Sequence, residues 1–219
     1  MARVLRLTEG EFQGLLSSIL GLVTGGTQTN QTQSDDTSTT DSESIGKISE
    51  KGQALLNNPK FKKKLSDISS SIGIDENSII KLMNHESGLN PSVKNPIGCV
   101  GLIQFCPDTS GGSTKTIAGK TYKLSDLQND LDLQMNAIKE FWSVAKRSGK
   151  LKGPEDLYIF NFWPAAAGKT DDFTLETKGM SATTVAKANP IFNRKLGKPI
   201  SSPLTVGDLK QYYRKTGMV

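Results

Sequence analysis

The sequence contains one long stretch that cannot contribute to a hydrophobic core. From Thr27 to Ser44 every residue is Thr, Gln, Asn, Ser, Asp or Glu. Such a composition buries too little apolar surface to offset the entropy lost on ordering, so we expect a flexible linker over residues 24–46. The linker separates a short N-terminal segment, residues 1–23, from residues 47–219, which must hold the folded core.

The N-terminal segment predicts an amphipathic helix over residues 8–23. Thr8 and Glu11 form a capping box, and apolar side chains follow along one stripe. These are Phe12, Leu15, Leu16, Ile19, Leu20 and Val23. The helix is too short and too polar to span a bilayer, which takes about 20 mostly apolar residues, so we expect no transmembrane segment here and a stripe that docks onto a partner chain or the folded domain.

A signal peptide is the alternative for this segment. Arg3 and Arg6 precede the apolar run, as in an export signal. Against it, Glu9 and Glu11 lie within the charged part, and no Ala-x-Ala-like cleavage site comes before Gly25. The docking helix is therefore the preferred interpretation.

The charge and composition of the chain limit the kinds of partner and cofactor that we expect it to bind. The 219 residues carry a formal net charge of +5, which favours an anionic partner such as a cell wall, a membrane surface or a nucleic acid. The dense run of lysines at residues 60–64 reads as a solvated helix face, and arginines do not alternate with aromatic residues, so we expect no nucleic-acid partner. His85 is the only histidine and lacks a second one at i+4, so we expect no metal and no other cofactor.

A helix that ends before Gly88 is predicted to place a carboxylate beside the core. Asp75 can cap its start, while Gly88 and the Asn90-Pro91 pair can end it. The apolar stripe consists of Ile79, Leu82 and Met83, and its spacing continues to Glu86. Burial at this position would raise the pKa of Glu86 and keep a fraction of it protonated near neutral pH.

Two short motifs around this carboxylate resemble a known family. Glu86 begins Glu-Ser-Gly-Leu-Asn-Pro, and residues 101–109 read Gly-Leu-Ile-Gln-Phe-Cys-Pro-Asp-Thr. The pair resembles the lytic transglycosylases, lysozyme-like enzymes of peptidoglycan cleavage, whose pattern is Glu-Ser-x-x-x-Pro and then Gly-Leu-Met-Gln-x-x-Pro-x-Thr. Ile103 replaces the usual Met and Cys106 a usually apolar residue, but neither change removes a group that the chemistry needs.

The resemblance implies a fold and a mechanism. We expect a mainly α, lysozyme-like (α+β) domain with a small irregular or hairpin region over residues 47–219, the resemblance reaching to about Asn193 and a helical extension following. In the implied mechanism Glu86 protonates the leaving oxygen, the N-acetyl group of muramic acid assists, and Glu86 then deprotonates the 6-hydroxyl to give an anhydro sugar. Ser87 would orient Glu86, and Gln104 with the backbone around Phe105 would hold the sugar.

A second carboxylate would change the reaction. True lysozymes use two carboxyl groups about 5 to 9.5 Å apart. Asp108 is the nearby candidate, although its place between Pro107 and Thr109 also suits a loop or cap residue. A hydrolase therefore remains the alternative to a transglycosylase.

An aromatic helix is expected to supply the opposite side of the site. It begins near Pro154 and contains Tyr158, Asn161 and Trp163. The family has an Ala-Tyr-Asn-Ala-Gly helix along the substrate, so the resemblance implies that these three residues contact the glycan. Two registers stay open, one with Trp163 in place of the family's Tyr and one in which Tyr158 and Asn161 make the polar contacts.

Other segments predict the remaining framework. We expect two short helices broken near residues 57–59, a hairpin or irregular region from Gly111 to Gly119, and one long helix from Ser125 to about Arg147. Thr205 and Asp208 form a capping box for a last helix. Cys99 and Cys106 flank the second motif, and a disulfide in an oxidising compartment and two buried thiols both remain open.

The location follows from the docking helix and linker. A wall-cutting domain on a polar linker suits a component of a larger assembly, and the opening residues 3–9 resemble the starts of some tailed-phage proteins. We therefore expect a virion enzyme that binds phage tail or baseplate proteins through residues 8–23 and acts on peptidoglycan in the periplasm or at the cell wall. The alternatives are a secreted or periplasmic bacterial enzyme and, from a different class, a structural or adaptor protein that only binds wall glycan.

Overall fold

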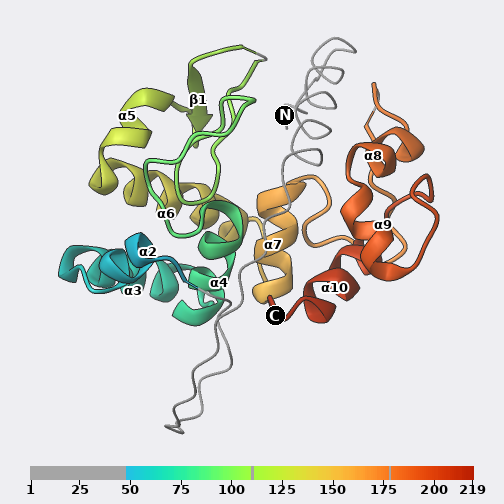
Figure 1. The fold of residues 1–219 in the computed structure, drawn as a ribbon, viewed down its shortest axis with the longest axis horizontal. Helices are drawn as coiled ribbons and strands as arrows, with labels where there is room; N and C mark the ends of the chain where they lie inside the picture. Colours follow the sequence, from blue (N-terminus) through green and yellow to red (C-terminus); the bar gives the residue numbers. More distant parts are fainter. Residues whose placement is uncertain (1–47, 110, 178) are drawn as a thin grey trace, which may run out of the picture.

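The computed structural model describes residues 48–109, 111–177 and 179–219. The predicted docking helix at residues 8–23 and the whole of the predicted linker at residues 24–46 lie outside these ranges. The described part is mainly helical with one two-stranded antiparallel hairpin, which confirms the predicted fold class (Figure 1). Its elements are α2 (Glu50–Leu56), α3 (Pro59–Ile72), α4 (Glu76–Ser87), β1 (Thr114–Ile117), β2 (Lys120–Lys123), α5 (Leu124–Asn129), α6 (Leu131–Arg147), α7 (Pro154–Phe162), α8 (Ala182–Ala188), α9 (Pro190–Leu196) and α10 (Val206–Lys215).

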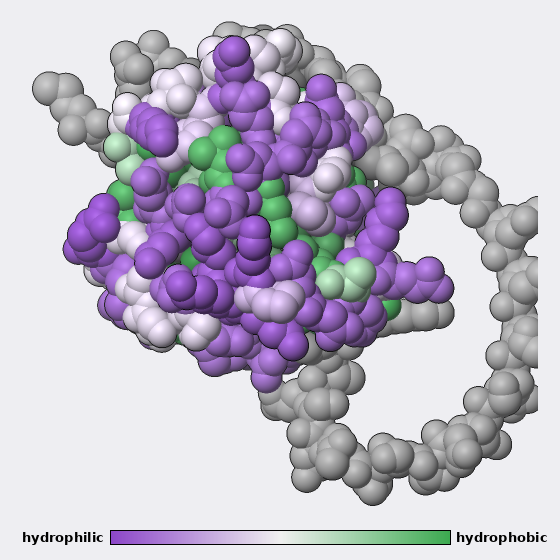
Figure 2. Space-filling model, turned by 90° about the vertical axis from the view of Figure 1, so that its left-hand side faces the viewer, coloured by the Kyte–Doolittle hydropathy of each residue, from purple (hydrophilic) through white to green (hydrophobic). Residues whose placement is uncertain are grey.

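Helices α3 and α6 pack along each other, and α3 also contacts α4. Asn58 caps α3 by accepting hydrogen bonds from the backbone N–H groups of Lys60 and Phe61, at the break that the sequence predicts. Phe61 and Leu65 face the core, while the lysines at positions 60, 62 and 63 are exposed. Figure 2 shows this side of the molecule, largely hydrophilic around a central strip of hydrophobic residues. The lysine run thus forms a solvated helix face.

The long helix predicted from Ser125 to Arg147 is wrong as a single element. The chain leaves the helical conformation at Asp130, where φ is −121° and ψ is 101°. The carboxylate of Asp130 then caps α6 by accepting a hydrogen bond from the N–H of Leu133. The hydrophobic spacing continues through the break, and for that reason the pattern did not reveal it.

Helix α7 lies between the N-terminal helices and the C-terminal group α8 to α10 (Figure 1). It contacts both α4 and α10, so it joins the two parts. The predicted capping box at the start of α10 is present: Thr205 accepts a hydrogen bond from the N–H of Asp208, and Asp208 accepts one from the N–H of Thr205. Lys198 pairs with the same carboxylate at 2.7 Å. Within the described ranges, no helix is long and apolar enough to cross a membrane.

Candidate active site

Glu86 lies in the last turn of α4, on the side that faces α7. The cap of α4 is Asp75, which accepts a hydrogen bond from the N–H of Ser78 at 2.9 Å. Gly88 ends the helix in the left-handed conformation, with φ 61°. The stripe of Ile79, Leu82 and Met83 is fully buried, so the helix presents its next residue on that face, Glu86, at the edge of the core. This is the placement that the helical spacing predicts.

The surroundings of Glu86 change its acidity. Burial raises the pKa of Glu86 to about 7, while a side-chain hydrogen bond with Asn161 acts in the opposite direction. Tyr158 and Tyr213 also surround this carboxyl: burial raises the pKa of both phenols, and the charge of Glu86 raises them further. A carboxyl with a pKa near 7 can give and take a proton at neutral pH.

Ser87 joins α4 to the loop that carries the second motif. Its hydroxyl lies 2.8 Å from the carbonyl oxygen of Met83 and 3.1 Å from that of Leu102, and it donates to them. The structure therefore places Ser87 as a link between the helix end and the loop. The predicted orientation of Glu86 by Ser87 would act through this link rather than through the carboxyl itself.

The motif loop makes a tight turn that uses both predicted sugar-binding residues. Val100 and Phe105 exchange two backbone hydrogen bonds, and Gly101 between them has φ 78°. Gln104 also has a positive φ, 56°, which is strained for a residue with a side chain, and its amide donates to the carbonyl of Gly101 at 2.9 Å. The ring of Phe105 is buried against Phe141, with centroids 5.7 Å apart. Both residues support the turn.

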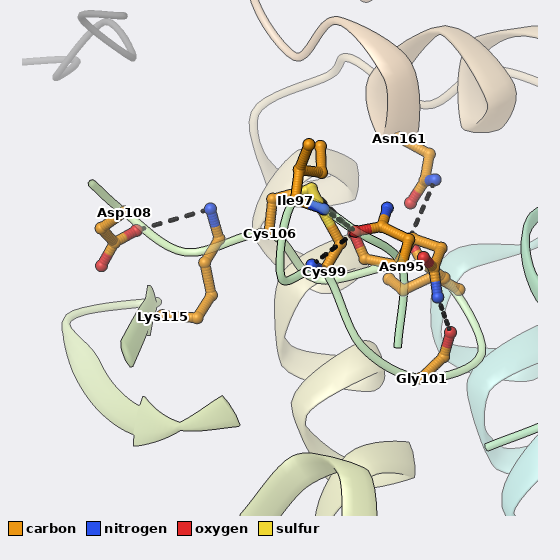
Figure 3. The surroundings of a disulfide bond; sticks show 10 residues. Asn95, Ile97, Cys99, Gly101, Cys106, Asp108, Lys115 and Asn161 are labelled. Carbon is orange, nitrogen blue, oxygen red and sulfur yellow. Dashed lines mark hydrogen bonds and ion pairs between the residues drawn. A yellow bond between two sulfur atoms is a disulfide. The ribbon is translucent and has the colours of Figure 1, made fainter. Parts of the chain in front are cut away.

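Asn161 connects the loop to α7 and to Glu86. Its side-chain nitrogen donates to the carbonyl of Ile103 at 3.3 Å, as Figure 3 shows, and its amide also hydrogen-bonds with Glu86. Tyr158, one turn earlier on α7, is 2% exposed and packs on Tyr213 with ring centroids 4.9 Å apart. Its hydroxyl is buried and has no hydrogen-bond partner among the residues that the structure describes.

Trp163 lies farther along the same segment. It follows α7 as the capping residue, is partly buried, and its ring centroid is 6.2 Å from that of Phe162. Of the two registers left open by the sequence, the structure brings Asn161 and Tyr158 to Glu86. Trp163 is left at the end of the helix.

Asp108 is engaged elsewhere. Its carboxylate lies 3.4 Å from the ammonium group of Lys115 and accepts a hydrogen bond from the N–H of Thr116 at 2.6 Å. In Figure 3 it points to the hairpin, on the opposite side of the disulfide from Asn161. Both contacts fit the interpretation of Asp108 as a loop residue.

A disulfide closes the loop around the second motif. It joins Cys99 and Cys106, and so selects the first of the two possibilities that the sequence left open (Figure 3). The side chain of Asn95 supports it by accepting hydrogen bonds from the N–H groups of Ile97 and Cys99. His85 is exposed, and no cluster of three His, Cys, Asp or Glu side chains within the described ranges could hold a metal ion.

Two residues near the site were missed by sequence reasoning. Tyr213 looks like an ordinary core residue of the last helix, and only the packing of α10 on α7 reveals its place beside Glu86. Gln134 is fully buried beneath the motif loop. A signal for Gln134 did exist, because it falls on the apolar stripe of its helix, three residues after Leu131 and four before Ile138.

A comparison with known proteins gives a family match for the part of the chain that contains α4 and the motif loop. Residues 66–150 match the family described as Transglycosylase SLT domain. The match supports an SLT, lysozyme-like relationship and, in general terms, peptidoglycan lytic transglycosylase activity, because members of the family are lytic transglycosylases. It covers both motifs and α6 but ends before α7. Searches of curated proteins and of solved structures found no significant match.

Proposed function

We propose that this protein cleaves the β-1,4 bond between N-acetylmuramic acid and N-acetylglucosamine in peptidoglycan by a lytic transglycosylase mechanism with Glu86 as its one catalytic carboxyl. The observation that carries the proposal is the position of Glu86 at the junction of α4, the motif loop and α7, where Asn161 hydrogen-bonds with it and burial raises its pKa to about 7. The family match over residues 66–150 supports it, because both motifs lie within the matched region.

The proposed reaction needs one group that is first an acid and then a base. Protonated Glu86 gives its proton to the glycosidic oxygen, and the N-acetyl carbonyl oxygen of the muramic acid residue attacks the anomeric carbon as the bond to the glycosidic oxygen breaks. The Glu86 carboxylate then takes the proton of the 6-hydroxyl while that oxygen attacks the same carbon and displaces the N-acetyl oxygen, which leaves a 1,6-anhydro sugar, re-forms the N-acetyl group and restores protonated Glu86. No water is consumed. The amide of Asn161 stabilises the carboxylate between the two steps, because its hydrogen bond favours the charged form.

The contacts of Asp108 favour this mechanism over hydrolysis. A hydrolase needs a second carboxylate across the scissile bond. Asp108 is bound by Lys115 and by the backbone of Thr116, which hold it to the hairpin. Its carboxylate is therefore not free to activate a water molecule beside Glu86.

Product analysis tests the proposal. Purified peptidoglycan digested with the protein should give muropeptides with anhydro ends, which mass spectrometry distinguishes from reducing ends by one water. Glu86→Gln should lower the rate by a factor of roughly 10² to 10⁴, the usual size of a general acid–base contribution. Asp108→Asn is the matched control and should leave both products and rate unchanged. Reducing ends that vanish in Asp108→Asn would show a hydrolase instead.

The same variants separate an enzyme from a glycan-binding protein. Glu86→Gln should still sediment with insoluble peptidoglycan, since the neutral amide has nearly the same shape as the carboxyl. If the wild type binds the polymer, releases no fragments and equals Glu86→Gln in every assay, the protein is a binder.

We also propose that the enzyme is carried by a phage tail, attached through residues 8–23. The support is the amphipathic pattern of that segment and the polar linker after it. The disulfide fits action outside a reducing cytosol, because disulfides persist in oxidising compartments such as the periplasm. A chain lacking residues 1–23 should be fully active but absent from purified virions. A mature protein that starts after residue 23 would show a signal peptide and a secreted or periplasmic enzyme.

A further inference from the structure

A buried carboxamide lies directly beneath the motif loop. Gln134 on α6 has no exposed surface, and its amide group makes three hydrogen bonds. Its oxygen accepts from the N–H of Leu102 at 2.8 Å, and its nitrogen donates to the carbonyls of Pro91 at 2.9 Å and Leu127 at 2.5 Å. Both N–H bonds of the amide are thus used, and three separate segments meet at one side chain.

The loop is shaped to receive this side chain. Gly101 has φ 78°, and a Cβ atom at this position would lie 2.6 Å from the carboxamide carbon of Gln134. That separation is far below van der Waals contact, so the absence of a side chain at Gly101 lets the backbone rest on the amide. The glycine of the second motif and Gln134 form one fitted contact.

A short series of contacts leads from Gln134 to Glu86. Gln134 holds the N–H of Leu102, and the carbonyl of Leu102 accepts the hydroxyl of Ser87. The next carbonyl, that of Ile103, accepts the amide of Asn161, which hydrogen-bonds with Glu86. Three successive peptide groups, from Gly101–Leu102 to Ile103–Gln104, therefore connect Gln134 with Ser87 and with Asn161.

We propose that Gln134 is a positioning residue for the reaction: it fixes the peptide groups of Leu102 and Ile103, and through them the placement of Ser87 and Asn161 around Glu86. The inference rests on the proposed function for its kinetic consequence. Its structural content, the fixed loop, does not depend on it. Small displacements of a catalytic group lower the rate strongly, because the reacting atoms must be held within a fraction of an ångström.

The chain supplies a matched control. Asn193 on α9 is also fully buried, and its side-chain nitrogen donates to two backbone carbonyls, of Ile200 at 3.3 Å and Ser202 at 2.8 Å. It fastens a loop of the C-terminal part and has no place in the series that leads to Glu86. Loss of either amide leaves buried backbone groups without partners, so both should lower the melting temperature.

The experiment compares Gln134→Met with Asn193→Leu, which keep the approximate volume and remove the amide. At a temperature where both are fully folded, Gln134→Met should lower kcat on peptidoglycan at least tenfold with KM changed less than threefold. Asn193→Leu should keep kcat within twofold of the wild type. An unchanged kcat in Gln134→Met, or an equal loss in Asn193→Leu, would overturn the positioning role.

Hydrogen exchange distinguishes this failure from that of the proposed function. The backbone amides of residues 102–104 should exchange at least tenfold faster in Gln134→Met and at the wild-type rate in Asn193→Leu, whether or not the protein cleaves peptidoglycan. Unchanged exchange contradicts the inference, whereas a wild type without cleavage contradicts only the proposed function. If Gln134→Met does not fold, Gln134→Asn keeps an amide one carbon too short to reach all three partners and should show the same kcat loss.

Discussion

The two sides of Glu86 are built in different ways. On one side, the motif loop is held by specific polar contacts: the amide of Gln134, the hydroxyl of Ser87 and the Cys99–Cys106 disulfide. On the other side, the C-terminal part packs aromatic rings. Tyr158 lies 4.9 Å from Tyr213, and the series continues through ring pairs between α7, α9 and α10.

The difference explains which side has a recognisable motif. A hydrogen bond or a tight turn needs a particular residue at a particular place, so the loop must keep Gly101 and Gln104 to hold its shape. A packed cluster of aromatic rings, such as that of α7, α9 and α10, needs only side chains of suitable volume and low polarity, and many combinations of rings can form it. This contrast fits a family match that ends at residue 150, before α7. The site therefore combines a loop that needs particular residues at particular positions with an aromatic cluster that many combinations of residues could form.

The largest expected effect on stability comes from removing one ring of the aromatic cluster of α7, α9 and α10. Tyr213→Ala should lower the free energy of unfolding by about 3 to 5 kcal/mol, the usual cost of deleting a buried aromatic side chain. Water that enters the space should also bring the pKa of Glu86 down from about 7 toward its ordinary value, so kcat should begin to fall at a lower pH. Denaturant unfolding and a pH–rate profile measure the two effects.

Tyr213→Phe is the control for that variant. It keeps the ring and should change neither stability by more than about 1 kcal/mol nor the pH profile. If Tyr213→Ala leaves the pH profile unchanged, the aromatic cluster does not maintain the raised pKa of Glu86, and the motif loop alone would have to do so.

The second prediction concerns the stability cost of Glu86. Its pKa is about 7 in the folded protein against 4.5 for an ordinary Glu, so the folded state binds the proton more tightly. The stabilising contribution of the proton is complete below about pH 4.5 and is lost as pH rises through about 7. Glu86→Gln should therefore match the wild type near pH 4 and exceed its free energy of unfolding by up to about 3 kcal/mol at pH 8. Urea unfolding at both pH values gives the comparison, and equal stability at pH 8 would mean that the carboxyl is not desolvated.

The third prediction tests the loop side. Replacing Cys99 and Cys106 by Ser should cost about 2 kcal/mol, because the disulfide closes only a short loop and limits the unfolded chain modestly. Activity should fall as well, since the bond spans Gly101 to Gln104. Reductant should have the same effect on the wild type and none on the double variant. Full activity in reductant would show that Gln134 and Ser87 suffice to hold the loop.

The smallest effect is expected at Asp108. Asp108→Asn removes the charge that pairs with Lys115, an interaction near the surface, and should change the free energy of unfolding by less than about 1 kcal/mol. The change should be smaller still at high salt, because ions screen such pairs. A decrease of several kcal/mol in the free energy of unfolding would instead show that the contacts of Asp108 are essential to the stability of the loop.

The sequence predicted the parts of the molecule that follow local rules. Asp75 and Gly88 bound the helix of Glu86, and Thr205 with Asp208 caps the last helix, because capping depends on residues a few positions apart. The break at Asp130 was not predicted, since the apolar spacing runs through it. Gln134 and Tyr213 were missed for another reason. Tyr213 lies beside Glu86 only through the packing of α10 on α7, which no local pattern encodes. The apolar stripe of α6 indicates that Gln134 is buried, but not that its hydrogen-bond partners lie in distant segments.

The surroundings of Glu86 have a further consequence for the order of folding. Helix α4 and the motif loop are made well before α7 and α10 during synthesis, and the contacts of Glu86 with Asn161 and Tyr213 span a large part of the chain. Contacts between distant segments form late, because closing a long loop costs entropy. Until those helices dock, Glu86 stays in water, ionised at neutral pH, and has no proton to give. On the proposed mechanism, an unfinished or partly folded chain therefore lacks the protonated Glu86 that the first step needs, and the raised pKa of Glu86 is reached only when α7 and α10 have docked.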